Sequence, residues 1–466
     1  MKLTIGQIVE ATGGRVIYEV TKKPVADLEF EVSSVVLDSR QVTEGGVFIA
    51  TVGERVDGHS FVASVFEKGA VLAVVQREPS ETEHWGTYLL VEDTLKALKD
   101  IGEYYRKTLR IPVIGITGSV GKTSTKEFIA GVLSEKYNVL KTQGNYNNEI
   151  GVPLTLLQIR EEHEAAVVEM GISDFGEMHR LSKMARPDVA VITNIGQCHL
   201  ENLKDRNGVL RAKTEIFDFM APEGKICLNG DDDKLRTVTA PQGKELRFFG
   251  LNSREAGTVY ATDVKSKGLW GSDAKLHLAS GEYFDGEIPL PGIHMVLNAT
   301  AAACVAEWLM LTPAQIQAGL KKVATIAGRN RLIRTEAYTL IDDCYNANPV
   351  SMKAGIDLLC MADTVKVAVL GDMFELGENS DALHREVGVY AAKKGVDRLI
   401  CVGANSRHMS EAAKEAGGIP VTYFESLEAL TEALQKDEEG LLPRESTVLI
   451  KASHGMHFSE LVDLLK

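Results

Sequence analysis

The chain has 466 residues, of which 44% are hydrophobic and 25% charged, a composition typical of globular domains that bury apolar cores. This length predicts about three domains. The net charge of −14 at pH 7 argues against nucleic acid as the main partner, because nucleic-acid binding needs a basic face. Any anionic ligand must therefore be held at a local positive site.

The cysteines and the apolar segments indicate the compartment. The six cysteines form no Cys-x-x-Cys pair, which favours reduced thiols in a cytoplasm over disulfides or a zinc site. The first ten residues lack the long apolar core of a signal peptide. The most apolar helix candidate, 298–311, is too short to span a bilayer and contains Glu307. We therefore expect a soluble, cytoplasmic protein without membrane insertion.

Residues 1–91 are predicted to form an N-terminal α/β domain without a phosphate loop. Two polar clusters, Asp38-Ser39-Arg40 and Asp57-Gly58-His59, interrupt its apolar segments. Arg40 could hold a diphosphate through bidentate hydrogen bonds. However, Asp-Ser and Asp-Gly are also common turn sequences, and from these residues alone turns are the better interpretation.

The stretch 111–124 organises the rest of the chain. An apolar strand at 113–116 runs into a turn with Gly118 and Gly121, and a helix is expected from Lys122 onwards. Backbone amides and the positive end of the helix dipole can hold a phosphate in such a turn. Lys122 would reach the β- and γ-phosphates, and the Thr123 hydroxyl would hold Mg²⁺.

This stretch departs from the strict phosphate-loop pattern in one position. The pattern places its first glycine five residues before Gly-Lys, where this chain has Ile116. The alternative is an ordinary strand, turn and helix with a surface lysine, and the strand before and helix after disfavour it. An amphipathic helix at 93–109 leads into the strand, so we place a domain boundary near residue 91.

The central domain, 92–326, is predicted to be a doubly wound sheet. Its expected strands alternate with helices, which indicates a mostly parallel sheet covered on both faces. A glycine-rich stretch at 257–290 predicts an antiparallel insertion. The expected parallel strands are 113–116, 138–141, 165–169, 189–193 and 225–228.

Three polar residues of the central domain are candidates for chemistry. Glu169 ends an apolar strand, and beside Thr123 it would suit Mg²⁺, which prefers oxygen ligands; the alternative is a glutamate facing solvent. His199 follows the next strand, where a lone histidine is usually structural. Lys213 lies on a helix, where a solvated surface charge is the ordinary interpretation.

The last domain, 327–466, is predicted to be a second doubly wound, Rossmann-like unit without a phosphate loop. Its strands are expected at 338–342, 365–370, 398–402, 421–424 and 447–450. Asn298 is expected to open the alanine-rich helix of the preceding domain. At the junction, Arg329 and Asp343 could close over a nucleotide, the arginine on phosphate and the carboxylate on ribose.

Taken together and in order, these motifs resemble the Mur ligase family over the whole length of the chain. Segments 370–377 with His384, and 343–352, resemble the branch of the family that adds D-alanyl-D-alanine. The other matching segments are 38–40, 57–59, 115–123, 144–155, 169–171, 193–199 and 212–216.

The resemblance implies an α/β fold of three domains and an ATP-driven amide ligation. D-alanyl-D-alanine would be joined to a UDP-muramoyl tripeptide through an acyl phosphate. The implied cofactors are ATP, two Mg²⁺ ions and a carbamylated lysine at Lys213. The implied partners are these small molecules, with no nucleic acid, and the protein is expected to be a monomer. The first domain would bind the UDP-sugar and the last the dipeptide.

The resemblance also implies roles for individual residues. Lys122, Lys213 and His199 would be catalytic. Thr123 and Glu169 would hold one Mg²⁺, and His199 and Lys213 the other. ATP would be held by Gly118, Ser119, Gly121, Lys122, Thr123, Ser124, Asn298, Arg329 and Asp343. The other substrates would contact Ser39, Arg40, Asp57, His59, Asn147, Asn148, Tyr345 and Asn346.

Two segments depart from the family pattern, and three rival functions were considered. The usual Gly-x-His-Asn is Gly292-Ile-His-Met295 here, and the usual Lys-Gly-Ser-Arg is Lys451-Ala-Ser-His454. The nearest rival is the ligase that adds diaminopimelate or lysine, whose Asp-Asn-Pro-Arg motif does not occur in this chain. Folylpolyglutamate synthase would lack the N-terminal domain. A regulatory GTPase would need an Asn-Lys-x-Asp motif, which is also absent.

Overall fold

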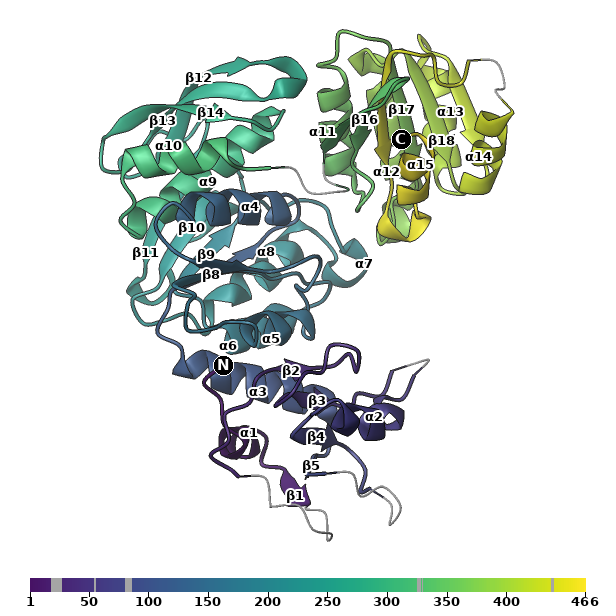
Figure 1. Ribbon diagram of the computed structural model, residues 1–466. Helices are drawn as coiled ribbons and strands as arrows, with labels where there is room; N and C mark the ends of the chain where they lie inside the picture. The colour runs from purple at the N-terminus through teal and green to yellow at the C-terminus, as the bar shows by residue number, and fades with distance from the viewer. Residues whose placement is uncertain (18–26, 54–55, 80–85, 325–327, 329, 437–439) are drawn as a thin grey trace.

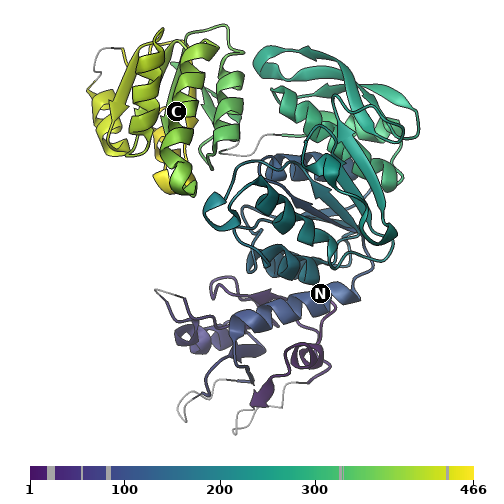
Figure 2. The same cartoon turned by 180° about the vertical axis from the view of Figure 1, so that it is seen from behind.

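The computed structural model describes residues 1–466 except 18–26, 54–55, 80–85, 325–327, 329 and 437–439. It contains three β-sheets of five, nine and six strands, which follow one another along the chain. In Figures 1 and 2 the N-terminal and C-terminal sheets lie at opposite ends of the molecule, with the nine-stranded sheet between them. The predicted boundary at 326–327 falls outside the described residues, and the boundary near 91 stays a prediction.

The N-terminal sheet has the strand order β1-β5-β4-β3-β2. Only β1 pairs antiparallel, with β5. Thr4 caps the first helix by accepting a hydrogen bond from the Gln7 amide. The elements are α1 (Ile5–Thr12), β1 (Arg15–Ile17), β2 (Val35–Val36), β3 (Val47–Ile49), α2 (Val62–Glu67), β4 (Leu72–Val75) and β5 (Tyr88–Leu90).

The central sheet has the order β14-β13-β12-β11-β10-β9-β6-β8-β7. It is parallel from β7 to β12, and β13 and β14 continue it as an antiparallel extension. Its strands are β6 (Val113–Thr117), β7 (Val139–Lys141), β8 (Ala165–Glu169), β9 (Val189–Ile192), β10 (Lys225–Asn229), β11 (Glu245–Gly250), β12 (Val259–Ser266), β13 (Ser272–His277) and β14 (Tyr283–Ile288).

Helices cover both faces of this sheet, as the alternating pattern predicts. One apolar core lies between the sheet and helices α4 and α9, and another lies between the sheet and α3, α5 and α6. The helices are α3 (Thr94–Thr108), α4 (Lys122–Leu133), α5 (Gly151–Leu156), α6 (Glu177–Ala185), α7 (Leu200–Leu203), α8 (Arg206–Thr214), α9 (Ile293–Trp308) and α10 (Pro313–Lys321).

The C-terminal sheet has the order β15-β16-β20-β17-β18-β19, with only β15 antiparallel. Asn348 caps α11, and Pro349 begins the helix. The elements are β15 (Arg331–Arg334), β16 (Tyr338–Asp342), α11 (Pro349–Leu359), β17 (Lys366–Gly371), α12 (Ser380–Lys394), β18 (Arg398–Val402), α13 (Ser406–Ala416), β19 (Val421–Phe424), α14 (Leu427–Gln435), β20 (Ser446–Lys451) and α15 (Ser459–Leu464).

One helix start was predicted wrongly. Asn298 does not begin its helix, because α9 already begins at Ile293. Gly292, which precedes it, has a φ of 99°, so the non-helical loop ends there. In the central and C-terminal domains, two strands, β11 and β15, were not predicted, and no strand positions were predicted for the N-terminal domain. Within the described residues, no helix combines the length and apolarity that a membrane crossing requires.

Candidate functional site

A cavity of about 540 Å³ lies between the central and C-terminal domains. The central domain contributes the turn before α4 and the loops after β8 and β9. The C-terminal domain contributes the loop after β16 and the start of α11. Of the predicted site residues, the cavity is lined by Ser119, Gly121, Lys122, Ser124, Asn147, Asn148, Glu169, His199, Asn298, Asp343, Tyr345 and Asn346.

The predicted phosphate loop forms one wall of this cavity. Gly118 and Gly121 have φ angles of 151° and 83°. A Cβ on Gly118 would lie 1.9 Å from the Thr193 hydroxyl, so only glycine fits there. Lys122 begins α4, and its Nζ donates to the Gly118 carbonyl at 2.8 Å. The first amides of a helix have no helical acceptor, so this turn can receive an anion.

The loop after β9 holds the phosphate loop from behind. Asn194 accepts a hydrogen bond from the Val120 amide at 3.0 Å and donates one to the Val120 carbonyl at 2.9 Å. The Gly196 amide donates to the Ser119 hydroxyl at 2.8 Å. These contacts fix the turn's backbone before any ligand is bound.

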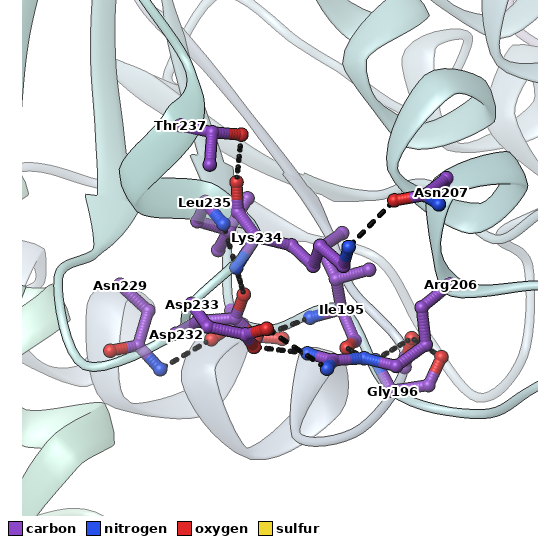
Figure 3. A network of polar contacts seen from close by, with 12 residues as sticks. Ile195, Gly196, Arg206, Asn207, Asn229, Asp232, Asp233, Lys234, Leu235 and Thr237 are labelled. Carbon is purple, nitrogen blue, oxygen red and sulfur yellow. Dashed lines mark hydrogen bonds and ion pairs between the residues drawn. The ribbon is translucent and has the colours of Figure 1, made fainter.

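A second layer of polar residues anchors the loop after β9 (Figure 3). Asp232 accepts hydrogen bonds from the amides of Ile195, Lys234 and Leu235 at 2.8, 2.9 and 2.9 Å. Arg206 donates to the Ile195 carbonyl at 2.8 Å and pairs with Asp233. This anchoring has no local sequence signal, because it depends on residues that follow different strands.

Glu169 and Thr123 form a buried oxygen cluster beneath the loop. The Thr123 hydroxyl donates to Glu169 Oε2 at 2.9 Å, and both side chains are buried. Asn147 donates to Glu169 Oε1 at 2.9 Å. Hydroxyl and carboxylate oxygens suit Mg²⁺, so this donor set fits the predicted ion. Among the described residues, no group of three or more His, Cys, Asp and Glu side chains stands ready to hold a metal.

Lys213 and His199 differ in their surroundings. Lys213 is fully buried in α8, and burial together with the charge of Lys122 lowers the pKa of Lys213 to about 8. His199 lines the cavity in a left-handed backbone conformation (φ 50°). Its Nδ1 lies 2.7 Å from Glu375 of the C-terminal domain, whose pKa is lowered by this hydrogen bond.

The far end of the cavity is formed at the domain junction. Asp343 accepts a hydrogen bond from Lys451 Nζ at 2.6 Å and another from the Asn330 amide at 3.2 Å. Asn298 lies within α9, where its side-chain oxygen accepts a hydrogen bond from the Thr125 hydroxyl at 3.0 Å. Arg329 lies outside the described residues. Lys451 was not identified as a partner of Asp343 from the sequence, since β16 and β20 are neighbours only in the folded sheet.

The four predicted residues of the N-terminal domain are not part of this cavity. Arg40 pairs with Asp38, which lowers the pKa of Asp38 to about 2, and Lys68 donates to the Ser39 carbonyl. His59 is buried, with Nδ1 2.6 Å from Asp57. Its Nε2 accepts a bond from the Gln76 amide at 3.1 Å. His59 also lines a separate cavity of about 90 Å³.

Three segments of the chain match family models of the Mur ligases. Residues 31–113 match the catalytic domain of the Mur ligase family, residues 116–306 the Mur ligase middle domain, and residues 328–454 the Mur ligase glutamate ligase domain. The UDP-N-acetylmuramoyl-tripeptide–D-alanyl-D-alanine ligase of Bacillus subtilis (strain 168) is 35% identical over 97% of each chain.

Two crystal structures show the same architecture. A structure of MurF from Acinetobacter baumannii is 34% identical, with a TM-score of 0.88 over 100% of this chain and 99% of that one. MurF ligase from Thermotoga maritima, in complex with ADP, is 27% identical, with a TM-score of 0.79 over 92% of this chain and 96% of that one.

Proposed function

The chain belongs to the Mur ligase family, and from this premise we infer that it joins D-alanyl-D-alanine to UDP-N-acetylmuramoyl-tripeptide. The reaction consumes ATP and yields the UDP-linked pentapeptide, ADP and phosphate in peptidoglycan precursor synthesis. The observation that carries this function is the cavity between two domains, where a preformed phosphate loop faces residues of the C-terminal domain. Reduced cysteines and the use of ATP support work in the cytoplasm; all six cysteines are free.

The residues around the cavity account for the first step. The tripeptide carboxylate attacks the γ-phosphorus, which forms an acyl phosphate and releases ADP. Lys122 neutralises charge on the transferring group, and the first amides of α4 hold the phosphate oxygens. Thr123 and Glu169 would hold one Mg²⁺, and His199 and Lys213 a second. When bound, these ions supply charge stabilisation for the phosphoryl oxygens.

In the second step, the amine of D-alanyl-D-alanine attacks the acyl carbon and displaces phosphate. Tyr345 and Asn346 of the C-terminal domain line the same cavity as Asn147 and Asn148 of the central domain, so closure around it would align the reacting groups. Asn298, Arg329 and Asp343 are assigned to the nucleotide. Ser39, Arg40, Asp57 and His59 are assigned to the UDP-sugar.

Lys213 is proposed to react with CO₂ and work as a carbamate. An ammonium would repel Mg²⁺ and has no lone pair to donate, whereas a carbamate offers anionic oxygens. Carbamate formation needs the neutral amine, which burial favours because it lowers the pKa of Lys213 to about 8. The charge of Lys122, which acts on Lys213 in the structure, would stabilise the anion that forms there.

ADP release with defined substrates tests the function. We expect ADP only when ATP, UDP-muramoyl tripeptide and D-alanyl-D-alanine are all present, and we expect little with glutamate or a free diamino acid. The control replaces the tripeptide with the dipeptide precursor and supplies lysine or diaminopimelate. Equal turnover in that control would assign the chain to the rival ligase. ADP release without any peptide would indicate a nucleotide switch instead.

A further inference from the structure

The loop after β17 carries a motif for which the proposed function gives no role. Segment 370–377 was singled out in the sequence together with His384. In the structure this loop reaches across the domain boundary, and Glu375 contacts His199 at 2.7 Å. The contact is made by a carboxylate from one domain and an imidazole from the other.

The C-terminal side of this contact is held rigidly by buried polar residues. Asp372 accepts hydrogen bonds from the Ser406 amide and hydroxyl, both at 2.7 Å. The Met373 amide donates to His384 Nε2 at 3.0 Å, and His384 itself is fully buried. The Phe374 amide donates to the Ser453 hydroxyl at 2.9 Å. Three consecutive residues are therefore fixed immediately before Glu375.

The central side is held just as firmly. The loop that ends at His199 is anchored through Ser119 to the phosphate loop and through Asp232 to the end of β10. Both contact residues have left-handed backbone, with φ of 50° at His199 and 61° at Glu375. Such conformations are uncommon for residues other than glycine and persist where the surroundings impose them.

The contact with Glu375 gives the two ring nitrogens of His199 different roles. A carboxylate can only accept, so His199 Nδ1 donates to Glu375, and the lone pair of the neutral ring is then on Nε2. His199 lines the cavity, whereas Glu375 is not among the residues that line it. Histidines that bind metals are commonly oriented in this way by a carboxylate on the other nitrogen.

We propose that Glu375 is the positioning residue for His199, fixing the tautomer that leaves Nε2 available to a divalent cation. Because Glu375 belongs to the C-terminal domain, the metal-binding imidazole is oriented only when that domain is docked. The inference rests on the proposed function, which assigns a metal to His199. It gives the 370–377 motif the task of coupling the position of the C-terminal domain to metal binding.

Variants at this position should fold, since the Glu375 side chain is 61% exposed and exposed ion pairs add little stability. Glu375→Ala removes the acceptor. Glu375→Gln keeps an amide oxygen that can still accept from Nδ1. Glu378→Ala is the matched control, since this exposed glutamate lies three residues further along the same loop.

Mn²⁺ binding to the full chain with a non-hydrolysable ATP analogue, followed by electron paramagnetic resonance, is the first measurement. We expect Glu375→Ala to weaken Mn²⁺ binding about 10-fold or more, as loss of such orienting carboxylates does. Glu375→Gln should recover most of the affinity, and Glu378→Ala should bind like the wild type. Wild-type affinity in Glu375→Ala, with weakened affinity in His199→Ala, would overturn the positioning role alone.

Nitrogen-15 NMR of the ligand-free chain reports the His199 tautomer directly, with His199→Ala used to assign its signals. We expect a single Nδ1–H tautomer in the wild type and a mixture in Glu375→Ala. An unchanged tautomer in Glu375→Ala overturns the inference. If His199→Ala leaves Mn²⁺ affinity unchanged, the metal role given to His199 under the proposed function is wrong, and the inference fails with it.

Discussion

Lys213 shows how burial changes the chemistry of a residue type that usually lies on the surface. Its position on a helix, read from sequence, favoured a solvated charge. In the structure it is among the largest fully buried side chains, next to the positive charge of Lys122. Both effects disfavour the ammonium form, which is why the pKa of Lys213 falls to about 8.

The carbamate proposed at Lys213 gives a pH-dependent prediction. Between the folded pKa of about 8 and the ordinary value of 10.5, the folded chain holds fewer protons on this lysine than the unfolded chain does. The fraction of Lys213 in the neutral amine form therefore increases as the pH rises through 8. At constant CO₂ pressure we expect ¹³C label from ¹³CO₂ at this side chain to increase from pH 6.5 to pH 8.5, measured by ¹³C NMR. Lys213→Ala is the control, and equal label in both proteins would refute the carbamate.

Lys122 gives the prediction for the phosphoryl step. Its ammonium is held over the phosphate loop by the Gly118 carbonyl, so it is placed before ATP arrives. Loss of a preorganised charge contact typically lowers kcat by about 10²-fold or more. We expect this loss for Lys122→Ala, measured as ADP release, with thermal unfolding unchanged. Lys141→Ala is the control, because this half-exposed lysine pairs with Glu127 instead. Near-normal turnover in Lys122→Ala would contradict the phosphate-loop assignment.

At the scale of elements, the parallel strands were predicted well because their apolar runs are buried on both faces. The predicted strand 165–169 has the observed bounds, and the start of α4 at Lys122 was also predicted correctly. The predicted start of α9 was wrong because the loop before the helix ends at Gly292, earlier than the alanine-rich pattern suggests. The short strand β15 lies at a sheet edge, where burial gives the sequence little pattern.

The site was predictable only where its residues follow one strand. Glu169 and the phosphate loop carry their own local sequence signals. The contacts of Glu375, Asp232 and Lys451 carry no such signal. The partner of Glu375 lies in the neighbouring domain, that of Asp232 in another loop and that of Lys451 after the neighbouring strand. Long-range pairing of this kind leaves no periodicity or spacing in the sequence of one chain.

The loop after β9 gives the prediction at this scale. Asp232→Ala leaves three backbone amides without an acceptor, which typically costs about 1–3 kcal/mol for each buried group. We expect lower stability towards urea and weaker binding of a fluorescent ATP analogue, since the same loop supports Ser119 and Val120. Asp233→Ala removes only an exposed pair with Arg206 and should cost about 1 kcal/mol or less. Equal effects from the two variants would contradict the anchoring role.

The apolar cores of the molecule do not coincide with its three sheets. A single apolar core runs from the N-terminal sheet, across α3, to one face of the central sheet. Helix α3 contacts α1 and β4 on one side and α5 and α6 on the other. The C-terminal domain has two cores of its own. It meets the central domain at the His199–Glu375 pair and where Arg334 stacks on Trp270, 4.2 Å from the ring centre.

This packing predicts how the chain unfolds. The N-terminal and central domains should unfold together, and the C-terminal domain in a separate transition, because cooperativity follows shared cores. Differential scanning calorimetry should therefore resolve two transitions. Ile101→Ala in α3 should lower the midpoint temperature of the transition of the N-terminal and central domains only. Removing a buried isoleucine side chain typically costs about 2–5 kcal/mol of stability. Leu399→Ala in β18 is the matched change for the other unit.

A saturating ATP analogue with Mg²⁺ should raise the midpoint temperatures of both transitions, because residues of the central and C-terminal domains line the cavity that would hold it. When the analogue concentration is about 100 times its dissociation constant, binding stabilises the folded chain by about 2.7 kcal/mol. This stabilisation is shared between the two units that the analogue contacts. A transition of the N-terminal domain alone, unaffected by Ile101→Ala, would show that the continuous core does not couple the first two domains. A C-terminal transition that the nucleotide does not move would place the ATP site within the central domain alone.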